Sequence, residues 1–594
     1  MRKTMALALV CGFLATGCAS VPTSGPIQQG AVLDTGRDDQ VIRVIARPPR
    51  SGMTPVEVVK GFLEASAGGA EGLTIAREYL TARRADSWAP EVGVRVYDDA
   101  GLTFEERSAR GVDLSGGLTG LIDGRGDYSL AAPAQVLRAK YALVNVAGEW
   151  RIDVCPDGLI LSGGDIARGF RTLPTYFLDP TFSTLVPNPI TVPVVGAGLA
   201  TTVVRSLLKG PTAWLAPSVK TAFPEGTTLA IDSVPVDSGV AQVDLTREVL
   251  SADDKTRQAM SAQLVWSLRS LTDVTGVRIT VAGQPFAVPG VSAVQPTSSW
   301  ATYSPDSPTS TTSSDSLFVA ANGAVSRLDV GVAGEVTAPK TPLAPLPGAA
   351  GKPGSSWSGP AVSVDGRQVA VLGRDATTLW SGRIGLGQPL VRRITGLQLS
   401  APSWDRFGGL WTVDRDRGVK LIRVGRPVLN IPVLSVNSSQ GLAGLNASDV
   451  VGIALSSDGM RAALQVRLGG HTLVVVARVE RRGDDVRLAD PRRIEAALTD
   501  VTDAAWASST DLAILGTSGA AEPSLLVADF GPTTSRVASP PAGAVALAAA
   551  PQRPLAVATQ LTGATAGGRV GASEIWIQVA GSWVLRAGGS DPAY

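Results

Sequence analysis

The sequence predicts a multidomain protein in which two small α+β or α/β domains are followed by an all-β propeller. Its 594 residues are enough for several domains of roughly 100–200 residues each. With 44% hydrophobic and 18% charged residues, the composition is that of a globular protein. Helical patterns belong to the first half of the chain, whereas short strands and glycine turns dominate after residue 316.

The first residues have the pattern of a bacterial lipoprotein signal. Arg2 and Lys3 precede an apolar run over 5–15, which is well short of the ~20 residues that span a bilayer. Small residues then lead to Cys18, as in the lipobox, where a cysteine receives a diacylglyceryl thioether and signal peptidase II cuts before it. Ala15 stands where that pattern usually has leucine. An ordinary secretory signal with a chance cysteine is the alternative interpretation.

Cleavage before Cys18 would make residues 1–17 the signal peptide and leave Cys18 with S-diacylglycerol and N-acyl groups. Several acyl chains anchor a protein stably, whereas one chain holds it only marginally. Residues 19–31, directly after Cys18, are small, polar and proline-containing, and we interpret residues 18–40 as a tether. Cys155 would then be the only free thiol, so no disulfide is expected. We therefore expect a lipid-anchored protein on the extracytoplasmic face of the cell membrane.

An α+β domain is expected over residues 41–185. A proline at the first helical position and an apolar stripe predict a helix over 54–66, and a second amphipathic pattern covers 71–82. The alternating pattern over 134–154, interrupted by a glycine turn, predicts a β-hairpin. The proline-rich stretch 183–198 is expected to be a connection.

A second compact α/β domain is expected over residues 195–290. A helical pattern over 199–211 ends at a Gly-Pro pair, and a longer one over 252–271 has two aspartates in its first turn, where they suit the helix dipole. Strands are expected at 227–235, 240–245 and 277–283. Ser, Thr and Pro dominate residues 291–315, which we interpret as an exposed linker.

A loose motif recurs through residues 316–594, and each copy is a turn followed by an alternating or apolar strand. The copies begin at residues 363, 403, 456, 506 and 549, so they are 40, 53, 50 and 43 residues apart. All-β repeats of about 40–50 residues are typical of β-propellers. A partial copy over 316–330 favours six blades, with five or seven as alternatives, and with closure by strands from the other end. A β-sandwich with chance Asp-Gly turns is the competing fold.

Few residues are available for catalysis or metal binding. Histidine occurs once, as His471, and the sequence has no CxxC or HExxH motif. Three other matches are interpreted as chance or structural: SxxK at 206–209, the aspartates at 405, 414 and 416, and the tripeptide RGD at 125–127. The formal net charge of +1 gives no footprint for nucleic acid. We therefore predict no enzyme activity, no catalytic, metal or cofactor site, and no nucleic-acid partner.

Four segments resemble the actinobacterial LpqB family of lipoproteins: VVKGFLEAS, AREYLTARRADSWAPEVGVRVYDD, TYFLDPTFSTLVPNPITVPV and VRSLLKGPTAWLAPSVKTAFPEGTTL. The order of lipobox, α+β domain, small α/β domain and propeller agrees with that resemblance. The middle domain of this family is of the GerMN type, named after proteins of spore formation and germination. Here it would include residues 207–211, Pro224 and the strand over 240–245.

The resemblance implies a partner and a role. LpqB-type proteins sit on the outer face of the cytoplasmic membrane and bind the extracellular domain of the sensor kinase MtrB. They tune phosphorylation of the regulator MtrA, which affects cell-wall homeostasis and cell division. Two other functions are left open by the residues: a cell-wall-binding scaffold, and an envelope hydrolase with an active site in the propeller.

Overall fold

The computed structural model describes the chain from residue 46 onwards with several gaps. The described ranges are 46–98, 100–194, 198–306, 316–330, 342–435, 440–495, 497–519, 522–532, 534–537, 539–560 and 573–594. Residues 43–594 form one compact unit by their contacts. Cys18, the signal peptide and the tether lie outside the described residues.

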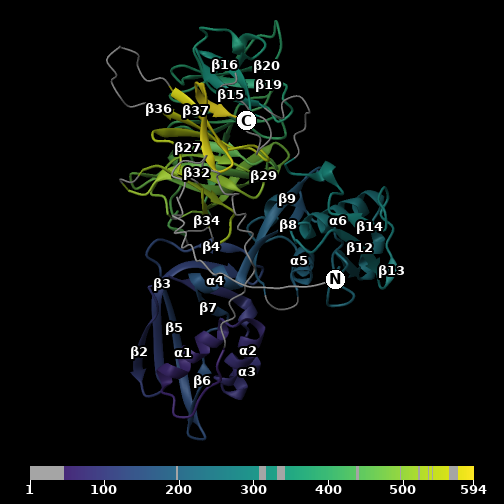
Figure 1. Cartoon of the computed structure of the whole chain (residues 1–594), viewed down its shortest axis with the longest axis vertical. Helices are drawn as coiled ribbons and strands as arrows, with labels where there is room; N and C mark the ends of the chain where they lie inside the picture. The colour runs from purple at the N-terminus through teal and green to yellow at the C-terminus, as the bar shows by residue number, and fades with distance from the viewer. Residues whose placement is uncertain are drawn as a thin grey trace, which may run out of the picture. The chain divides into compact units, whose positions relative to one another are not determined.

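The first group of elements combines four helices with a sheet (Figure 1). The helices are α1 Pro55–Ser66, α2 Gly69–Glu78, α3 Ala82–Ser87 and α4 Gly163–Gly169, with a 3-10 turn η1 at Pro90–Val92. The strands are β1 Gly93–Tyr97, β2 Thr103–Ser108, β3 Gly111–Asp123, β4 Tyr128–Leu130, β5 Val136–Val146, β6 Glu149–Val154 and β7 Leu159–Ser162. The sheet order is β6-β5-β3-β1-β7, and β2 and β4 also pair with β3.

Local sequence signals place these helices. Thr54 and Glu57 form a capping box at the start of α1, whose buried Val59 and Phe62 pack on the sheet. The predicted helix over 54–66 and the hairpin over 134–154 are confirmed. The predicted second helix is shorter than expected: α2 ends at Glu78, because Thr81 caps the separate helix α3.

The stretch expected to be a connection is instead half of a β-ribbon. Strands β8 Phe170–Leu178 and β9 Leu185–Pro193 pair antiparallel over their whole length, from Phe170↔Pro193 to Leu178↔Leu185. Prolines are tolerated because both strands of a two-stranded ribbon are edges, where a missing backbone N–H costs no hydrogen bond. The interpretation of 183–198 as a connection is therefore wrong for residues 185–193. The ribbon packs in the core of the following elements rather than in that of the first sheet.

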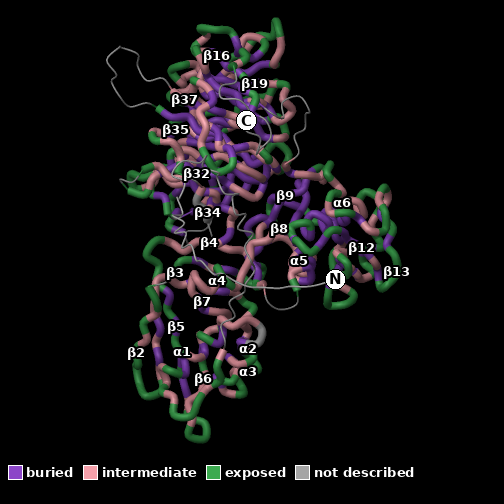
Figure 2. The backbone as a smooth tube through the Cα atoms, viewed as in Figure 1, coloured by how far each residue is buried: buried purple, intermediate pink, exposed green. Residues whose placement is uncertain are grey.

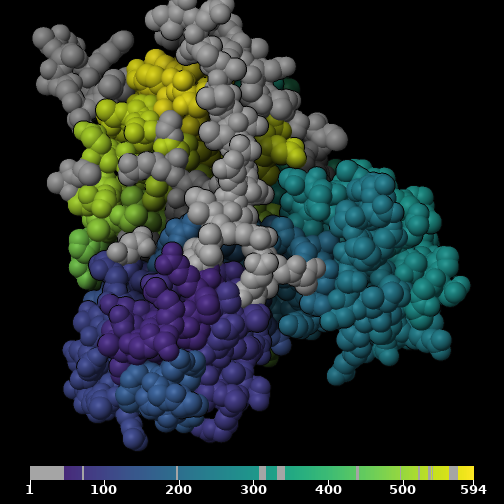
Figure 3. All heavy atoms as spheres, turned by 60° about the horizontal axis from the view of Figure 1, so that its bottom comes forward, coloured from purple at the N-terminus to yellow at the C-terminus, as the bar shows by residue number. Residues whose placement is uncertain are grey.

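The second group of elements surrounds a buried helix (teal in Figure 1). It consists of α5 Leu199–Leu208, η2 Ala216–Ser218, β10 Val236–Asp237, β11 Val240–Leu245, η3 Arg247–Ser251, α6 Asp254–Leu268, β12 Gly276–Val281, β13 Gln284–Pro285 and β14 Val294–Pro296. The sheet order is β10-β11-β12-β13, with β14 also on β12. The expected strand over 227–235 is wrong; only an isolated bridge, Leu229↔Leu245, occurs there. Figure 3 shows the teal side chains gathered in one body.

Helix α6 is buried on all sides from Ala259 to Leu268. Such burial requires partners for its polar side chains. Gln263 donates to the carbonyl of Tyr176 on β8 at 2.8 Å and accepts from the backbone N–H of Ala222 at 2.7 Å. Ser267 accepts from the backbone N–H of Tyr176 at 2.9 Å. These bonds attach the ribbon to α6.

The expected exposed linker over 291–315 contains regular secondary structure within residues 294–303. Strand β14 pairs with β12, and a 3-10 turn η4 follows at Ala301–Tyr303. The indole of Trp300 donates to Gln295 Oε1 at 2.8 Å. The linker interpretation is therefore wrong for residues 294–306. Gln295 and Trp300 stand among the prolines and serines there, and both form hydrogen bonds with side chains of α6. Residues 307–315 lie outside the described part of the chain.

Six sheets make up the propeller in the described part of the remaining chain. They are β39-β15-β16-β17, β18 to β21, β22 to β25, β27 to β30 with β26, β31 to β34, and β35 to β38. The first three blades have β15 Ser316–Ala321, β16 Ala324–Asp329, β17 Ala344–Pro345, β18 Trp357–Val362, β19 Gln368–Gly373, β20 Thr378–Arg383, β21 Val391–Thr395, β22 Ser403–Trp404, β23 Leu410–Asp414, β24 Gly418–Ile422 and β25 Leu429–Ile431.

The last three blades complete the ring. They have β26 Val433–Leu434, β27 Val450–Leu455, β28 Arg461–Leu468, β29 His471–Arg482, β30 Asp485–Arg493, β31 Asp500–Trp506, β32 Leu512–Thr517, β33 Ser524–Ala528, β34 Thr534–Arg536, β35 Ala544–Ala548, β36 Ala556–Gln560, β37 Ser573–Val579, β38 Ser582–Gly588 and β39 Ser590–Ala593. Short 3-10 turns lie at Ala349–Gly351 (η5) and Ala447–Asp449 (η7). Buried residues concentrate on these strands (purple in Figure 2).

Ring closure uses the last strand of the chain. Strand β39 pairs with β15 as the innermost strand of the first blade, and it contacts the innermost strands of both neighbouring blades, β18 and β35. The predicted six-bladed fold, closed from the other end, is confirmed. The recurring sequence motif marks the turn between the first and second strands of blades two to six.

A buried carboxyl on β31 makes the stability of the propeller depend on pH. Asp503 accepts from the side chain of Gln465 and from the backbone N–H of Leu547, so it joins three blades. Burial raises the pKa of Asp503 from 3.8 to about 6. The native state therefore holds this proton at pH values where the unfolded state has released it, and the contribution of Asp503 to stability falls as pH rises from about 4 to about 6.

We expect Asp503→Asn to remove this dependence. The free energy of unfolding of wild type relative to Asp503→Asn should fall by roughly 2 kcal/mol between pH 4 and pH 6.5, given about 1.4 kcal/mol per pKa unit and an unfolded-state carboxyl that is already more than half ionised at pH 4. Urea denaturation of both proteins at several pH values measures the difference, and any constant effect of the substitution cancels. Parallel pH profiles for the two proteins would contradict the prediction.

Candidate functional site

The structure places the residues that the sequence singled out in separate environments. Cys18 lies outside the described residues. His471 begins β29 with an exposed side chain, and its Nδ1 lies 3.1 Å from Asp500 Oδ2. This contact lowers the pKa of Asp500. Ser206 and Lys209 lie at the end of α5, where Lys209 is the exposed C-cap residue.

Two of the three aspartates that the sequence singled out, Asp405 and Asp414, bind different protein donors. Asp405 is buried and accepts from the Trp411 indole at 2.8 Å and from Arg481 at 2.7 Å. Asp414 accepts from the backbone N–H of Leu397 at 2.9 Å. Within the described part of the chain, no group of three or more His, Cys, Asp or Glu side chains is placed to hold a metal ion.

The tripeptide at 125–127 does have a structural role, which the chance interpretation missed. It forms the turn between β3 and β4, and Gly126 adopts φ +85. Arg125 donates to the carbonyl of Pro211 at 2.9 Å, just beyond helix α5. The backbone N–H of Thr191 on β9 donates to the Gly126 carbonyl at 2.8 Å. A Cβ at Gly126 would lie 3.1 Å from the carbonyl oxygen of Thr191, so glycine allows this close approach.

Asp127 in the same turn binds the propeller. Its carboxylate accepts two bonds from Arg492 Nη1 on β30, at 2.8 and 3.0 Å, although the residues are 365 positions apart. The Arg492 guanidinium also lies over the Trp214 ring, 5.1 Å from its centroid, and the Trp214 indole donates to the carbonyl of Asp490 at 2.8 Å. The turn over 125–127 therefore contacts all three domains.

Burial and charge attraction have opposite effects on the ionisation of Asp127 beside Arg492. Burial raises the pKa of Asp127, and the charge and hydrogen bonds of Arg492 oppose that rise. Both side chains are mostly buried, at 16% and 19% exposure. In such a setting each charge depends on the other, because removing one leaves the other desolvated and unpaired.

Polar side chains continue the junction into the ribbon. Asn188, on β9, is buried and its Oδ1 accepts from the backbone N–H and the hydroxyl of Thr212 at 3.1 and 2.8 Å. Its amide donates to the Thr175 hydroxyl at 2.9 Å. Asn188 therefore holds the segment after α5 against the β8–β9 ribbon.

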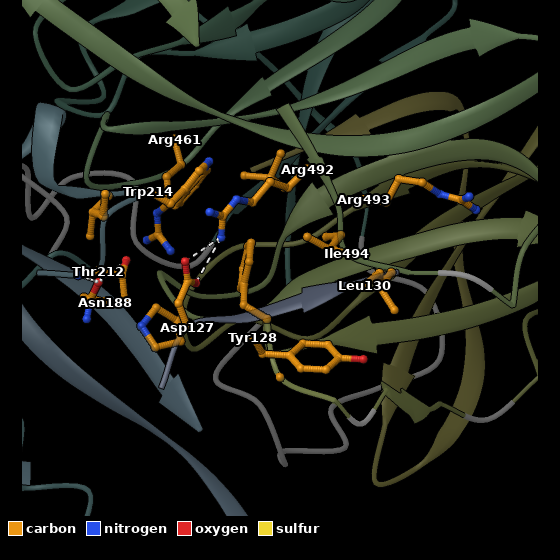
Figure 4. Close-up of a pocket in the computed structure, with 15 residues that line it drawn as sticks. Asp127, Tyr128, Leu130, Asn188, Thr212, Trp214, Arg461, Arg492, Arg493 and Ile494 are labelled. Carbon is orange, nitrogen blue, oxygen red and sulfur yellow. Dashed lines mark hydrogen bonds and ion pairs between the residues drawn. The ribbon is translucent and has the colours of Figure 1, made fainter. Parts of the chain in front are cut away.

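A small cavity of about 40 Å³ lies at this junction. Figure 4 shows Asp127 and Arg492 pointing toward one another beside Trp214, whereas Arg493 points away from them. The fully buried Arg461 of β28 also lines the cavity, and its Nε and Nη1 have no hydrogen-bond partner among the described residues. A volume of this size has room for about two or three water molecules, which such N–H groups would bind.

A wider, open cleft of about 390 Å³ lies on the side of the first sheet. Strands β1 and β3 contribute half of the residues that line it, including Arg95 and Asp123. Asp127 and Arg492 line both spaces. Their ion pair therefore borders both the small cavity and the open cleft.

A second set of contacts connects the ordered segment after η4 to the propeller. Asp306 accepts from the backbone N–H and hydroxyl of Ser509 at 2.8 and 2.9 Å, and from the hydroxyl of Ser457 at 3.0 Å. Arg461 forms an ion pair with Asp458 and donates to the Ser509 carbonyl. Ser457 lies in the turn between β27 and β28, and Ser509 lies in the turn between β31 and β32. Both turns are copies of the recurring motif, so the motif residues of two blades form this contact surface.

We expect Asp127→Asn to weaken the junction. The substitution keeps the shape of the side chain but leaves the Arg492 charge buried without a counter-ion, so the free energy of unfolding should fall by about 2 kcal/mol. The exposed pair of Arg205 and Asp232 gives a matched control, because Asp232→Asn should cost less than about 1 kcal/mol. Urea denaturation compares the two, and equal losses would show that Asp127 has no special role.

The junction escaped prediction because its partners are far apart in sequence. Trp214 and the Asp490 carbonyl are 276 positions apart, and Asp306 and Ser509 are 203 apart. One local signal was available. A short Arg-Gly-Asp turn carries two opposite charges, and both of them can face neighbouring domains.

In the described part of the chain, no helix has the length and apolarity to cross a bilayer.

Comparisons with solved structures give remote likenesses. TolB from Acinetobacter baumannii is 15% identical, with a TM-score of 0.33 over 47% of this chain and 66% of that chain. The tandem GerMN domains of the sporulation protein GerM from Bacillus subtilis are 16% identical, with a TM-score of 0.19 over 21% of this chain and 46% of that chain.

Comparisons of sequence cover almost the whole chain. Three family models match: "Lipoprotein LpqB, N-terminal domain" at residues 48–167, "Sporulation and spore germination" at 174–287, and "Lipoprotein LpqB beta-propeller domain" at 335–593. Lipoprotein LpqB of Thermobifida fusca (strain YX) is 30% identical over 564 residues, 87% of each chain. Lipoprotein LpqB of Mycobacterium tuberculosis (strain CDC 1551 / Oshkosh) is 29% identical over 550 residues, 88% of this chain and 87% of that protein. The chain belongs to the LpqB family of lipoproteins.

Proposed function

We propose that this lipoprotein is anchored through Cys18 to the extracytoplasmic face of the cell membrane. There it binds the sensor domain of a two-component histidine kinase of the MtrA–MtrB type and modulates signalling for cell-wall homeostasis and cell division. The observation that carries the proposal is the junction around Asp127, which ties three domains together through buried contacts. A partner that contacts one domain therefore meets the other two in a defined arrangement.

Modulation has a simple physical route. A protein that prefers one conformation of the kinase sensor domain shifts the population toward that conformation. The preference must be a difference in binding free energy between the two conformations, because equal affinity for both would shift nothing. Broad surfaces on a propeller and a GerMN-like domain suit such protein contacts.

Anchoring supplies the local concentration. The 29 residues from Cys18 to Ala46 span at most about 100 Å when fully extended. A partner in the same membrane then meets the lipoprotein at an effective concentration that the tether sets. A modest intrinsic affinity is therefore sufficient for function at the membrane.

Replacing Cys18 should release the protein from the membrane. We expect Cys18→Ala to move the chain from the membrane pellet to the soluble fraction and to abolish incorporation of labelled palmitate, because the sulfur that takes the diacylglycerol is gone. Cys155→Ala is the matched control and should leave both readouts unchanged, since Cys155 is buried in the first domain. Retention of Cys18→Ala in a carbonate-washed pellet would refute anchoring at this residue.

Binding is tested with purified proteins. A chain that begins at residue 19 keeps every core described above, and it is titrated with the MtrB sensor domain by isothermal calorimetry. We expect saturable binding with a Kd of micromolar or below. Asp232→Asn should not affect it, and Asp127→Asn should weaken it if the arrangement of the domains matters. No binding up to 100 micromolar, about −5.5 kcal/mol, would count against the proposed function.

A further inference from the structure

The second blade of the propeller has an unusual excess of positive charge. Its strands and turns, residues 357–395, contain five arginines against two aspartates and no lysine or glutamate, a net charge of +3. The arginines are Arg367, Arg374, Arg383, Arg392 and Arg393. The proposed function makes no use of this surface.

The acidic residues of this blade do not neutralise the arginines. Asp365 accepts from the hydroxyl of Ser363, and Asp375 accepts from the hydroxyl of Thr377 at 2.8 Å. Among the described residues, no carboxylate forms an ion pair with any of the five guanidinium groups. Arg393 donates to the Ser381 hydroxyl at 2.7 Å, and the other four arginines are exposed. Their charges are therefore free to interact with a partner.

Three of these arginines surround an exposed apolar turn. In an antiparallel blade, the first and third turns lie at the same end. Accordingly, the backbone N–H of Ile384 donates to the Arg367 carbonyl at 2.9 Å. Arg383 and Arg392 flank the turn between β20 and β21, whose tip residue Leu386 is 86% exposed.

The turn exposes Leu386 at its tip. Gly385 and Gly387 flank it, and Val391 beside it is 47% exposed. Partly buried Trp357 and Trp380 lie on the same blade with ring centroids 5.9 Å apart. We define the basic turn as Arg367, Arg383, Leu386, Val391 and Arg392.

We propose that the basic turn docks onto an anionic lipid surface. Guanidinium groups bind phosphate oxygens in a planar, two-pronged geometry, and each basic residue near an anionic membrane adds attraction. A protruding leucine can enter the boundary between headgroups and acyl chains, where burial of apolar area adds to this attraction. The proposal rests on the membrane location proposed above, and it assigns a surface by which the anchored propeller lies on the bilayer.

A lipid surface fits the basic turn better than a protein partner. In protein–protein interfaces, the residues that contribute most of the binding energy are aromatic or arginine side chains seated in well-packed pockets. A protein partner would therefore need a recess on this surface for such a side chain. Here the apolar part consists of Leu386 at the tip of a turn and the half-exposed Val391, and neither of the two cavities described above includes them. Arginine charges that pair with no carboxylate of the described residues, placed around an exposed leucine, match the diffuse field and soft surface of a membrane.

The test uses the chain that begins at residue 19, so that no acyl group contributes. Cosedimentation is measured with vesicles of phosphatidylglycerol and phosphatidylcholine (40:60) and with vesicles of phosphatidylcholine alone, at 50 and 500 mM NaCl. We expect binding to the anionic vesicles only, with strong loss at high salt. The double variant Arg383→Gln/Arg392→Gln should reduce the partition coefficient about 30-fold, and Leu386→Ser about fivefold.

A matched control removes the same charge from the opposite ends of other blades. Arg415 lies in the turn between β23 and β24, and Arg467 lies near the end of β28, before the turn to β29; both are exposed. Arg415→Gln/Arg467→Gln should keep at least half of the wild-type binding. Inorganic phosphate at 10 mM should not compete beyond its ionic strength if the ligand is a surface rather than a free phosphate.

Three results would overturn the proposal. One is absence of salt-sensitive binding by wild type, and another is equal loss in the Arg383/Arg392 and control variants. The third is loss of MtrB binding by Arg383→Gln/Arg392→Gln with unchanged vesicle binding, which would make the basic turn a protein-binding surface. Unchanged thermal unfolding of each variant shows that the fold is intact. Binding of the sensor domain is measured separately, so failure of this proposal leaves the proposed function standing.

Discussion

Removing residues 590–594 is expected to prevent closure of the propeller. Strand β39 forms the innermost strand of the first blade, and its loss would expose the edge of β15 and the sides of β18 and β35. Because a domain of this kind is stabilised by only 5–15 kcal/mol, losing the strand that closes the ring should remove cooperative unfolding of the propeller altogether. Unpaired strand edges also promote aggregation.

Differential scanning calorimetry of the truncated chain measures this effect. A point substitution in the same segment gives the control. Tyr594 donates its hydroxyl to the Pro554 carbonyl at 2.7 Å, and Tyr594→Phe loses that bond alone, at a cost of about 1 kcal/mol. A truncated chain that unfolds with the wild-type enthalpy and midpoint would show that β39 is not needed for closure.

Arg461→Met is expected to cause the largest loss of stability among single substitutions at the domain contacts. Arg461 and Asp458 are 1% and 0% exposed, so the substitution leaves a buried carboxylate without its counter-ion. Breaking such a pair typically costs 3–5 kcal/mol. The aromatic rings of Trp506 and Phe530, 5.1 and 5.6 Å from the guanidinium, lose a cation–π contact as well.

A double-mutant cycle isolates the ion pair. Asp458→Asn keeps an acceptor for the backbone N–H of Met460, which lies 2.8 Å from Asp458 Oδ1. The double variant Arg461→Met/Asp458→Asn should recover at least 1 kcal/mol relative to the sum of the single losses, because neither charge is then left alone. Strictly additive losses would mean that the two charges do not depend on each other.

Elements fixed by short-range signals were predictable from the sequence. Thr54 with Pro55 fixes the start of α1, and Asp253 caps α6 by accepting from the backbone N–H of Thr256 at 2.8 Å. The propeller was predictable because its repeat is local: each motif copy is one turn and one strand. The partial copy at residue 316 gave the sixth blade and the need for a closing strand.

Elements that depend on tertiary context were not predictable. Prolines at 187 and 189 argued against a strand. They are tolerated in β9 because this strand pairs with β8 alone, so its other edge needs no backbone N–H for a further strand. Likewise, a Ser/Thr/Pro-rich composition predicted an exposed linker, whereas Trp300 and Gln295 attach that segment to α6. Composition cannot reveal a hydrogen bond to a helix 34 positions away.

The contacts between domains were the least predictable part. Arg125 and Asp127 carry no signal for their partners at Pro211 and Arg492, because nothing local specifies a residue 86 or 365 positions away. The signal-peptide pattern at Cys18 is different, since a short segment read by processing enzymes needs no tertiary context. That prediction lies outside the described residues and stays a prediction.

Crosslinking capture from intact membranes tests the central claim most directly. Cells that express wild type or Cys18→Ala at equal levels are treated with a short amine-reactive crosslinker, and the protein is purified under denaturing conditions. The account predicts that wild type brings down the sensor kinase MtrB and that Cys18→Ala loses most of this capture. Capture of other envelope proteins without MtrB, or undiminished capture by Cys18→Ala, would contradict it.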